Sequence, residues 1–218
     1  MSENTTPKQK DSEPQAKSDR KKEIFSWIRT FAITIGVALV LIFFVFINAT
    51  VPSASMENTI KTGSRLIGFR FSYWFSSPKR GDIILFRFPL DESETYIKRV
   101  IGLPGETVTI HDGKVYIDDS EQPLTENYLK ETWTWKTGDY TFEVPEDSCF
   151  VMGDNRNDSE DSRSWAEDAI LEGKATTEKE ANQYSFVKKS AIKGKAIWVY
   201  YKSPHLLTGT ADYGKEQK

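Results

Sequence analysis

Apolar residues are distributed very unevenly along this chain of 218 residues. Residues 30–47 (TFAITIGVALVLIFFVFI) carry no charge and are almost all apolar, and the apolar character reaches back to Ile24. Such a run is just long enough to span a bilayer core as a helix, whereas a buried core helix keeps a polar face. A cleavable signal sequence has a shorter run and a small-residue cleavage site. We therefore predict an uncleaved transmembrane anchor at residues 24–47.

The charges beside this anchor predict its orientation. Four basic residues lie before or near its start: Arg20, Lys21, Lys22 and Arg29. Lys61 is the only basic residue within about fifteen residues after it. The positive-inside rule then predicts a cytoplasmic N-terminus and an extracytoplasmic domain at residues 48–218. Residues 1–23 are rich in Ser, Glu, Lys, Gln and Asp, and are expected to be a disordered cytoplasmic tail.

Beyond the anchor, the pattern changes to short runs typical of β-strands. Residues 82–88 (DIILFRF) form a nearly continuous apolar run between Arg80-Gly81 and Pro89, which predicts a buried strand. The turn Asp112-Gly113 predicts a hairpin between residues 107–111 and 114–118. Further strands are predicted at residues 96–101, 140–144, 148–152 and 195–201. The domain is therefore expected to be mainly β.

One stretch of the domain has a different pattern. Residues 164–167 (SWAE) and 177–180 (TEKE) both fit the capping box that begins a helix. We therefore expect short helices at residues 165–172 and 178–184, within a helical insert at residues 164–184.

Composition excludes several kinds of site. The formal net charge of −3 gives no general basic field, so we expect no nucleic-acid partner. A single cysteine, Cys149, excludes an internal disulfide and any multi-cysteine metal site. The two histidines, His111 and His205, leave little for a metal cage, and we expect neither metal nor cofactor.

A serine and a lysine are candidates for nucleophilic chemistry. Ser53 and Ser55 follow the anchor in the segment VPSASM, which is otherwise compatible with a plain linker. A serine nucleophile needs a base, and both histidines lie at poor positions, one in a predicted turn and one in the tail. A buried lysine can serve as the base because burial lowers its pKa. Lys98 lies inside the strand-like run YIKRVI, where the alternative is an edge lysine that faces water.

A polar segment, residues 153–163 (GDNRNDSEDSR), directly follows an apolar strand. Its acids and arginines can pair to hold a backbone shape, and its hydroxyls can orient an amine. The alternative is a solvated loop with no role in chemistry.

Together these segments resemble the bacterial type I signal peptidases, which are membrane-anchored Ser/Lys proteases. PSASM resembles the nucleophile box, PKRGDIILFRFP the strand box, YIKRVIGLPGE the lysine box and GDNRNDSEDSR the acidic loop box. GKAIWVYY resembles the closing strand of the family. The short interval between the lysine box and the acidic loop is similar to the Gram-positive form, whereas the insert at residues 164–184 departs from the pattern.

The resemblance implies a role for each matching residue. It makes Ser55 the nucleophile and Lys98 the general base, with Ser53 donating to the oxyanion and Ser159 orienting the lysine. It implies structural support from four residues of the acidic loop: Asp154, Arg156, Asp161 and Arg163. It implies a substrate groove shaped by six residues: Val51, Pro52, Met56, Ile60, Tyr96 and Ile97. It also implies a coiled antiparallel β-sheet as the catalytic domain.

The function implied is cleavage of signal peptides from secretory preproteins after small, A-x-A-like residues. The implied location is a bacterial cell membrane, crossed once, so the partners are preproteins and the lipid bilayer. Two alternatives remain from the residues themselves. One is a sortase-like transpeptidase that uses Cys149 and a histidine, and the other is a membrane-anchored binding module without enzymatic activity.

Overall fold

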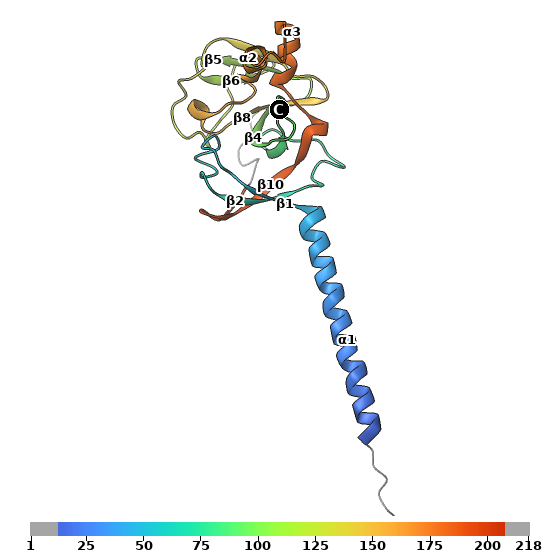
Figure 1. The fold of residues 1–218 in the computed structure, drawn as a ribbon. Coiled ribbons are helices and arrows are strands. Elements are labelled where there is room, and N and C mark those ends of the chain that lie inside the picture. The colour runs from blue at the N-terminus through green and yellow to red at the C-terminus, as the bar shows by residue number, and fades with distance from the viewer. Residues whose placement is uncertain (1–12, 208–218) are drawn as a thin grey trace, which may run out of the picture. The chain divides into compact units, whose positions relative to one another are not determined.

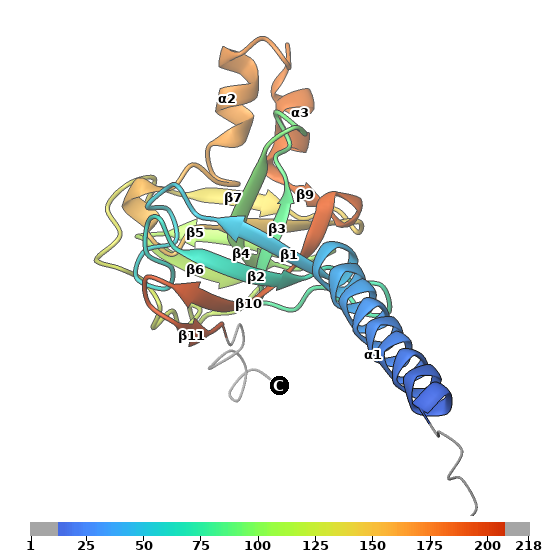
Figure 2. The ribbon, with the colours of Figure 1, turned by 60° about the horizontal axis from the view of Figure 1, so that its bottom comes forward.

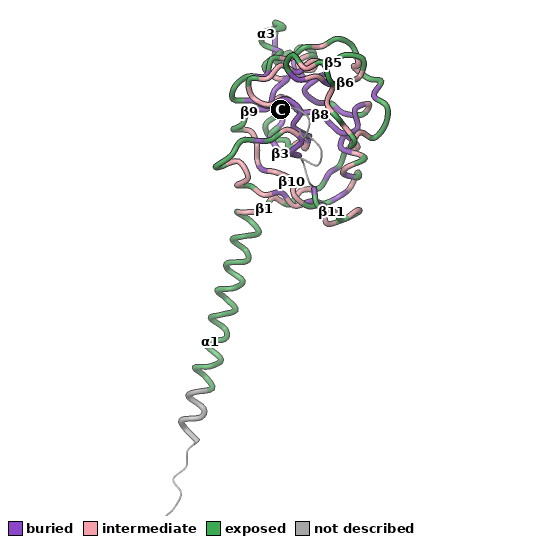
Figure 3. Tube along the Cα trace, turned by 180° about the vertical axis from the view of Figure 1, so that it is seen from behind, coloured by how far each residue is buried: buried purple, intermediate pink, exposed green. Residues whose placement is uncertain are grey.

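The computed structural model describes residues 13–207, and the chain separates into two compact units between Phe44 and Val45. The first unit contains helix α1 (Glu13–Val40), which continues into a π-helical turn, η1 (Leu41–Val45) (Figure 1). By length and composition, the helix at residues 20–45 is apolar enough to cross a membrane, and its apolar window of 18 residues has a mean hydropathy of 2.4. None of that apolar window is buried within the protein (Figure 3). Such a helix is what the predicted anchor requires.

Helix α1 differs from the expected anchor at both ends. Residues 13–23, which we expected to be disordered, belong to the helix, and the remainder of the expected tail, residues 1–12, lies outside the described residues. Glu, Gln, Ala, Lys and Arg in this segment favour helix, and extending an existing helix is easier than starting one. At the other end, Phe46 and Ile47 leave the helix and begin the first strand.

The second unit is built on a large antiparallel sheet (Figures 1 and 2). Among the described residues it has eight strands in the order β1-β2-β10-β3-β4-β8-β9, with β11 paired to β10. The strands are β1 (Phe46–Thr50), β2 (Arg65–Phe69), β3 (Ile83–Arg87), β4 (Thr95–Gly102), β8 (Ser148–Met152), β9 (Val187–Lys188), β10 (Ile192–Tyr201) and β11 (His205–Leu206). The mainly β, antiparallel fold class is therefore confirmed.

A second sheet of three strands has the order β6-β5-β7. Its strands are β5 (Thr107–His111), β6 (Lys114–Ile117) and β7 (Tyr140–Glu143). Asp112 and Gly113 join β5 to β6 with φ values of +47° and +67°. Two successive positive φ angles match the tight hairpin turn that Asp-Gly favours, so the predicted hairpin is confirmed.

Strand β3 explains why one apolar run is continuous rather than alternating. Ile84 and Phe86 pack into one hydrophobic cluster, and Ile83 and Leu85 pack into another on the opposite face. Because both faces of β3 are covered, all four residues are buried. This strand therefore lies between two parts of the core.

The predicted insert is helical, and Figure 2 shows its two helices standing together. They are α2 (Trp165–Leu171) and α3 (Glu178–Ala181), followed by the 3₁₀ turn η3 (Asn182–Ser185). The side chain of Thr177 accepts a hydrogen bond from the Glu180 N–H, as its capping box predicts. The capping box predicted at Ser164 is wrong, because the Ser164 hydroxyl donates instead to the Asp161 carbonyl. Two further 3₁₀ turns are η2 (Arg156–Asp158) and η4 (Lys189–Ala191).

Candidate active site

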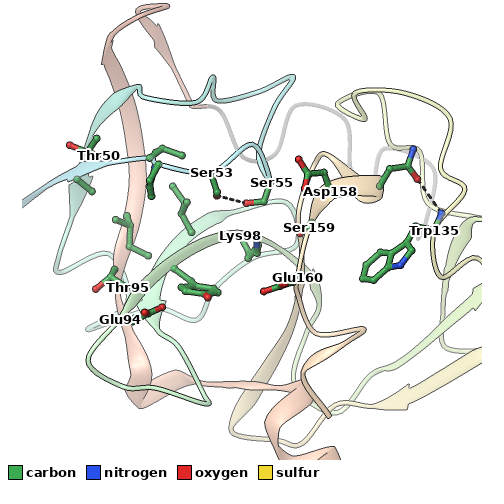
Figure 4. Close-up of a pocket in the computed structure, with 17 residues that line it drawn as sticks. Thr50, Ser53, Ser55, Glu94, Thr95, Lys98, Trp135, Asp158, Ser159 and Glu160 are labelled. Atoms are coloured by element: carbon green, nitrogen blue, oxygen red, sulfur yellow. Dashed lines mark hydrogen bonds between the residues drawn. The ribbon is translucent and has the colours of Figure 1, made fainter. Parts of the chain in front are cut away.

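A cleft of about 830 Å³ brings together three segments that are far apart in the sequence (Figure 4). One is the end of β1 and the loop after it, the second is the start of β4, and the third is the acidic loop. Eight of the residues implied by the family resemblance line this cleft: Val51, Pro52, Ser53, Ser55, Tyr96, Ile97, Lys98 and Ser159. The sheet is therefore curved enough for β1 and β4 to form facing walls, although three strands separate them.

Both strand walls of the cleft have backbone without a strand partner on one side. Strand β1 is the terminal strand of the sheet and pairs only with β2. Strand β4 pairs with β3 along residues 95–99, but its ladder with β8 begins only at Arg99. Residues 95–98 therefore have one unpaired edge, which can bind an extended peptide by backbone hydrogen bonds.

Ser55 is held by backbone contacts with the acidic loop. Its carbonyl accepts the Asn155 N–H at 3.0 Å, and the Asn155 side-chain amide donates to the Ala54 carbonyl at 3.1 Å. A Cβ atom at Gly153 would lie 2.5 Å from the Ser55 carbonyl oxygen and 2.2 Å from Ser159 Oγ. Only glycine therefore lets the acidic loop approach the two serines this closely. The hydroxyls of Ser53 and Ser55 lie 3.2 Å apart.

Lys98 is buried at the base of the cleft, and Figure 4 shows its amine between Ser55 and Ser159 in that view. Its residue is only 4% exposed, so the alternative of an edge lysine facing water is wrong. Burial lowers the pKa of the Lys98 amine to about 8, against the attraction of the Asp161 carboxylate. Roughly a tenth of the amine is therefore neutral at pH 7, and only this neutral form can accept a proton.

Ser159 lines the same cleft as Lys98 and is joined to Asp161, whose carboxylate attracts the lysine amine. The Ser159 hydroxyl donates to Asp161 Oδ2 at 2.7 Å, which leaves the oxygen of Ser159 free to accept a further hydrogen bond. Asp161 also accepts the Gly153 N–H at 3.0 Å and pairs with Arg163 Nε at 2.8 Å. Burial opposes ionisation of Asp161, but Arg163 outweighs it and lowers the pKa of the carboxyl. Asp161 and Arg163, two of the four expected support residues, thus form a fully buried ion pair.

The other two expected support residues do not pair with each other. Asp154 forms a bidentate ion pair with Arg99, at 2.8 Å to Nε and 2.6 Å to Nη2. Arg156 pairs with Glu126 instead. Sequence reasoning missed Arg99 and Glu126. Arg99 carries a visible signal, since a charge inside the apolar run YIKRVI needs a buried partner.

Two residues expected in the substrate groove lie elsewhere. Met56 and Ile60 are fully buried in the core cluster beneath the Ser55 loop, and neither lines the cleft. The Ile60 N–H donates to the Met56 carbonyl at 2.7 Å, so one helical turn directs both side chains inward. Nine further lining residues were missed: Ala49, Thr50, Leu85, Glu94, Thr95, Trp135, Asn157, Asp158 and Glu160.

The cysteine and the histidines lie outside the cleft. Cys149 is fully buried in β8, and burial raises the pKa of its thiol to about 12. A thiol in such surroundings stays protonated and is a poor nucleophile. His111 is paired with Asp139 in the smaller sheet. Within residues 13–207, no group of His, Cys, Asp and Glu is arranged to hold a metal ion.

The family model described as "Signal peptidase, peptidase S26" matches residues 24–201. The chain belongs to this signal peptidase family. It is 39% identical over 173 residues to a signal peptidase I of Leptolyngbya laminosa, covering 75% of this chain and 83% of that one. It is 35% identical over 155 residues to a signal peptidase I of Bacillus licheniformis, covering 67% and 82%.

A crystal structure of a signal peptidase I from Enterococcus faecalis V583 is 33% identical, with a TM-score of 0.40. The match covers 55% of this chain and 97% of that chain. Membership of the signal peptidase family makes this chain a peptidase, which favours an enzyme over the alternative of a binding module.

Proposed function

We propose that this signal peptidase is a membrane-anchored serine endopeptidase that uses Ser55 and Lys98 as a catalytic dyad. Its substrates are exported preproteins, from which it removes the N-terminal signal peptide after small, A-x-A-like residues. The observation that carries the proposal is the meeting of Ser55 and the buried Lys98 in one cleft (Figure 4). The rival nucleophile, Cys149, is buried in the core and does not line that cleft.

The chemistry follows from the protonation state of the lysine. Neutral Lys98 takes the proton of the Ser55 hydroxyl, and the Ser55 oxygen attacks the scissile carbonyl. The lysine then gives this proton to the leaving amine, and a water molecule hydrolyses the acyl-enzyme. Ser159 donates its own proton to Asp161 at 2.7 Å, and we assign its free acceptor oxygen the role of orienting the Lys98 amine during the reaction.

The oxyanion of the tetrahedral intermediate needs hydrogen-bond donors. We assign this role to the Ser53 hydroxyl and the backbone N–H of Ser55. The Ser53 hydroxyl lies 3.2 Å from Ser55 Oγ, close to the position where the attacked carbonyl must sit. Loss of one such donor typically costs about 10²–10³-fold in rate.

The substrate binds as an added strand. An extended peptide in the cleft can bond to the free edge of β1 and to the unpaired edge of residues 95–98. Val51, Leu85 and Ile97 give this part of the cleft an apolar lining, which suits small apolar side chains.

The proposed location follows from the anchor. The helix at residues 20–45 crosses the membrane once, with the N-terminus in the cytoplasm and the catalytic domain outside. Since β1 begins at Phe46, directly after the span, one wall of the cleft is tied to the membrane surface from which signal peptides emerge.

The test uses the full chain in detergent with a purified preprotein, and mass spectrometry identifies the cleavage site. We expect cleavage after a small residue, abolished by Ser55→Ala and by Lys98→Met. Two matched controls, Cys149→Ala and Lys61→Met, should leave cleavage intact. Normal cleavage by either dyad variant, or loss of cleavage in Cys149→Ala with its fold intact, would overturn the proposal.

A further inference from the structure

A second pocket, of about 410 Å³, lies at one end of the main sheet. The end of β2 and the end of β3 both flank the start of β10 there, since Phe69 pairs with Lys195 and Phe86 pairs with Ile192. Four basic side chains line this pocket: Arg70, Arg87, Lys189 and Lys193. Its remaining lining residues are Tyr73, Trp74 and Ile192, so no acidic residue balances these charges within the pocket.

The positive charges are not neutralised by neighbouring carboxylates. Within the described part of the chain, none of the four basic side chains forms an ion pair within 4.0 Å. Arg87 donates to the Ser190 carbonyl at 3.1 Å, and Lys193 donates to Thr95 Oγ1 at 2.5 Å. Both partners are neutral, so the pocket keeps its positive potential and favours an anion.

The pocket lies beside the point where the chain leaves the predicted membrane span. Val45 is the last residue of that span, and its carbonyl accepts the Arg70 N–H at 3.0 Å. Phe46, the next residue, pairs with Phe69 at the start of the β1–β2 ladder. Val45, Phe46, Phe69 and Arg70 all belong to the second unit. The position of the pocket beside the end of the span therefore does not depend on how the anchor is tilted.

An exposed aromatic segment adjoins the basic residues. Trp74 is 68% exposed and Phe75 is 97% exposed, and the ring of Phe71 packs edge-on against Trp74. Large exposed aromatic side chains beside basic residues are typical of the interface between lipid acyl chains and headgroups.

We propose that this pocket binds the phosphate headgroup of an anionic phospholipid. The proposal rests on the membrane anchoring proposed above. Guanidinium and ammonium groups of the pocket bind the phosphate oxygens, and Trp74 and Phe75 enter the acyl-chain region beside the headgroup. A bound lipid thereby fixes the catalytic domain to the membrane at a second point, next to the exit of the anchor.

The experiment titrates the full chain, held in dodecyl maltoside, with soluble short-chain lipids. Dihexanoylphosphatidylglycerol is the anionic probe, with dihexanoylphosphatidylcholine and inorganic phosphate as comparisons, and calorimetry measures binding. Arg70→Gln with Lys189→Gln removes two pocket charges whose side chains form no hydrogen bond or ion pair within residues 13–207. Lys61→Gln with Lys114→Gln removes two exposed charges outside the pocket as the matched control.

We expect saturable binding of the anionic lipid that the pocket variant weakens about thirty-fold, at roughly one kcal/mol per basic residue. The control pair should change the affinity by less than about threefold. Equal affinity for the phosphatidylcholine analogue, equal loss in both double variants, or equally tight binding of inorganic phosphate would overturn the lipid assignment.

Two further measurements separate this proposal from the proposed function. The pocket variant should keep preprotein cleavage in detergent, because neither altered residue lines the catalytic cleft. Resistance of the wild-type chain to alkaline carbonate extraction from vesicles tests the anchor itself, independently of the titration.

Discussion

At the scale of single residues, the site depends on an amine whose charged form is destabilised by burial. Lys98 is 4% exposed, and burial lowers the pKa of its amine to about 8. The same desolvation that disfavours the charged lysine supplies the neutral base. Catalysis and stability therefore make opposite demands on this one side chain.

The pH dependence of the reaction should follow this pKa. We expect kcat/KM to fall about tenfold per pH unit well below pH 8, because only the neutral amine accepts the Ser55 proton. The measurement is preprotein cleavage by the full chain between pH 5 and 10. Activity that is already maximal at pH 6 would contradict a lysine base.

Replacing Lys98 by methionine should increase the stability of the fold, because it removes the cost of burying the amine. The folded-state pKa of about 8 lies below the ordinary value of 10.5, so the unfolded chain binds more protons between these values. Lys98 therefore destabilises the fold at and below pH 8, and this penalty disappears as the pH rises to 10.5. We expect Lys98→Met to raise the free energy of unfolding by on the order of 3 kcal/mol at pH 7.

Thermal unfolding of the full chain in detergent, at pH 7 and at pH 10.5, measures this difference. The gap between the variant and the wild type should be large at pH 7 and close to zero at pH 10.5. A variant less stable than the wild type at pH 7 would mean that the lysine is stabilised by its surroundings.

At the scale of elements, the helical insert packs against aromatic residues that support one wall of the cleft. Trp165, at the start of α2, packs edge-on against Phe88 with ring centroids 5.5 Å apart and also contacts Tyr96. Phe88 stacks on Tyr96 at 4.1 Å, and Tyr96 lines the cleft. The insert therefore connects directly to one wall of the substrate site.

Removing this connection should destabilise the domain and weaken substrate binding. We expect Trp165→Ala to cost about 3–5 kcal/mol, as other large-to-small changes at fully buried aromatic positions do. Leu171→Ala, at a residue of the same helix that is 84% exposed, is the control and should change stability by less than about 0.5 kcal/mol. Chemical denaturation gives the free energies, and cleavage kinetics should show a raised KM in the Trp165 variant. Equal effects of the two substitutions would show that the insert does not support the cleft.

Some of the strands could be predicted from the sequence pattern, and others could not. The strand predicted at residues 82–88 and the hairpin around Asp112-Gly113 were predictable, because burial on both faces and a tight turn leave local signatures. Strand β2 was missed because Gly68 interrupts it. A Cβ atom there would lie 2.9 Å from the Leu85 side chain, a contact with a residue distant in sequence. Strands β9 and β11 have two residues each, too few for any period to show.

At the scale of the whole molecule, buried ion pairs join the segments that form the site. Arg99 in β4 pairs with Asp154 in the acidic loop, and the Thr59 hydroxyl donates to the same carboxylate from the loop after Ser55. This cluster therefore ties all three segments together. The partners of Arg99 and Arg156 could not be predicted from the sequence, because they depend on the closure of the sheet rather than on spacing.

Breaking the Arg99–Asp154 ion pair should destabilise the fold and lower the activity. We expect Arg99→Met to cost about 3–5 kcal/mol, because it leaves the Asp154 carboxylate buried without its counter-ion. Lys130→Met removes a partly exposed pair with Glu57 and should cost less than about 1 kcal/mol. Urea unfolding compares the two, and similar costs would show that the Arg99 pair is no more than a surface contact. Arg99→Met should also be far less active at a temperature where it remains folded.

The order of strands in the main sheet has a consequence for biosynthesis. The central strand β10 (Ile192–Tyr201) lies between β2 and β3, although it is synthesised long after both. During translation, β1 can pair with β2 and β3 can pair with β4, but the two pairs become one sheet only through β10. The two walls of the cleft, β1 and β4, therefore come to lie in one sheet only after the late strand has entered between β2 and β3.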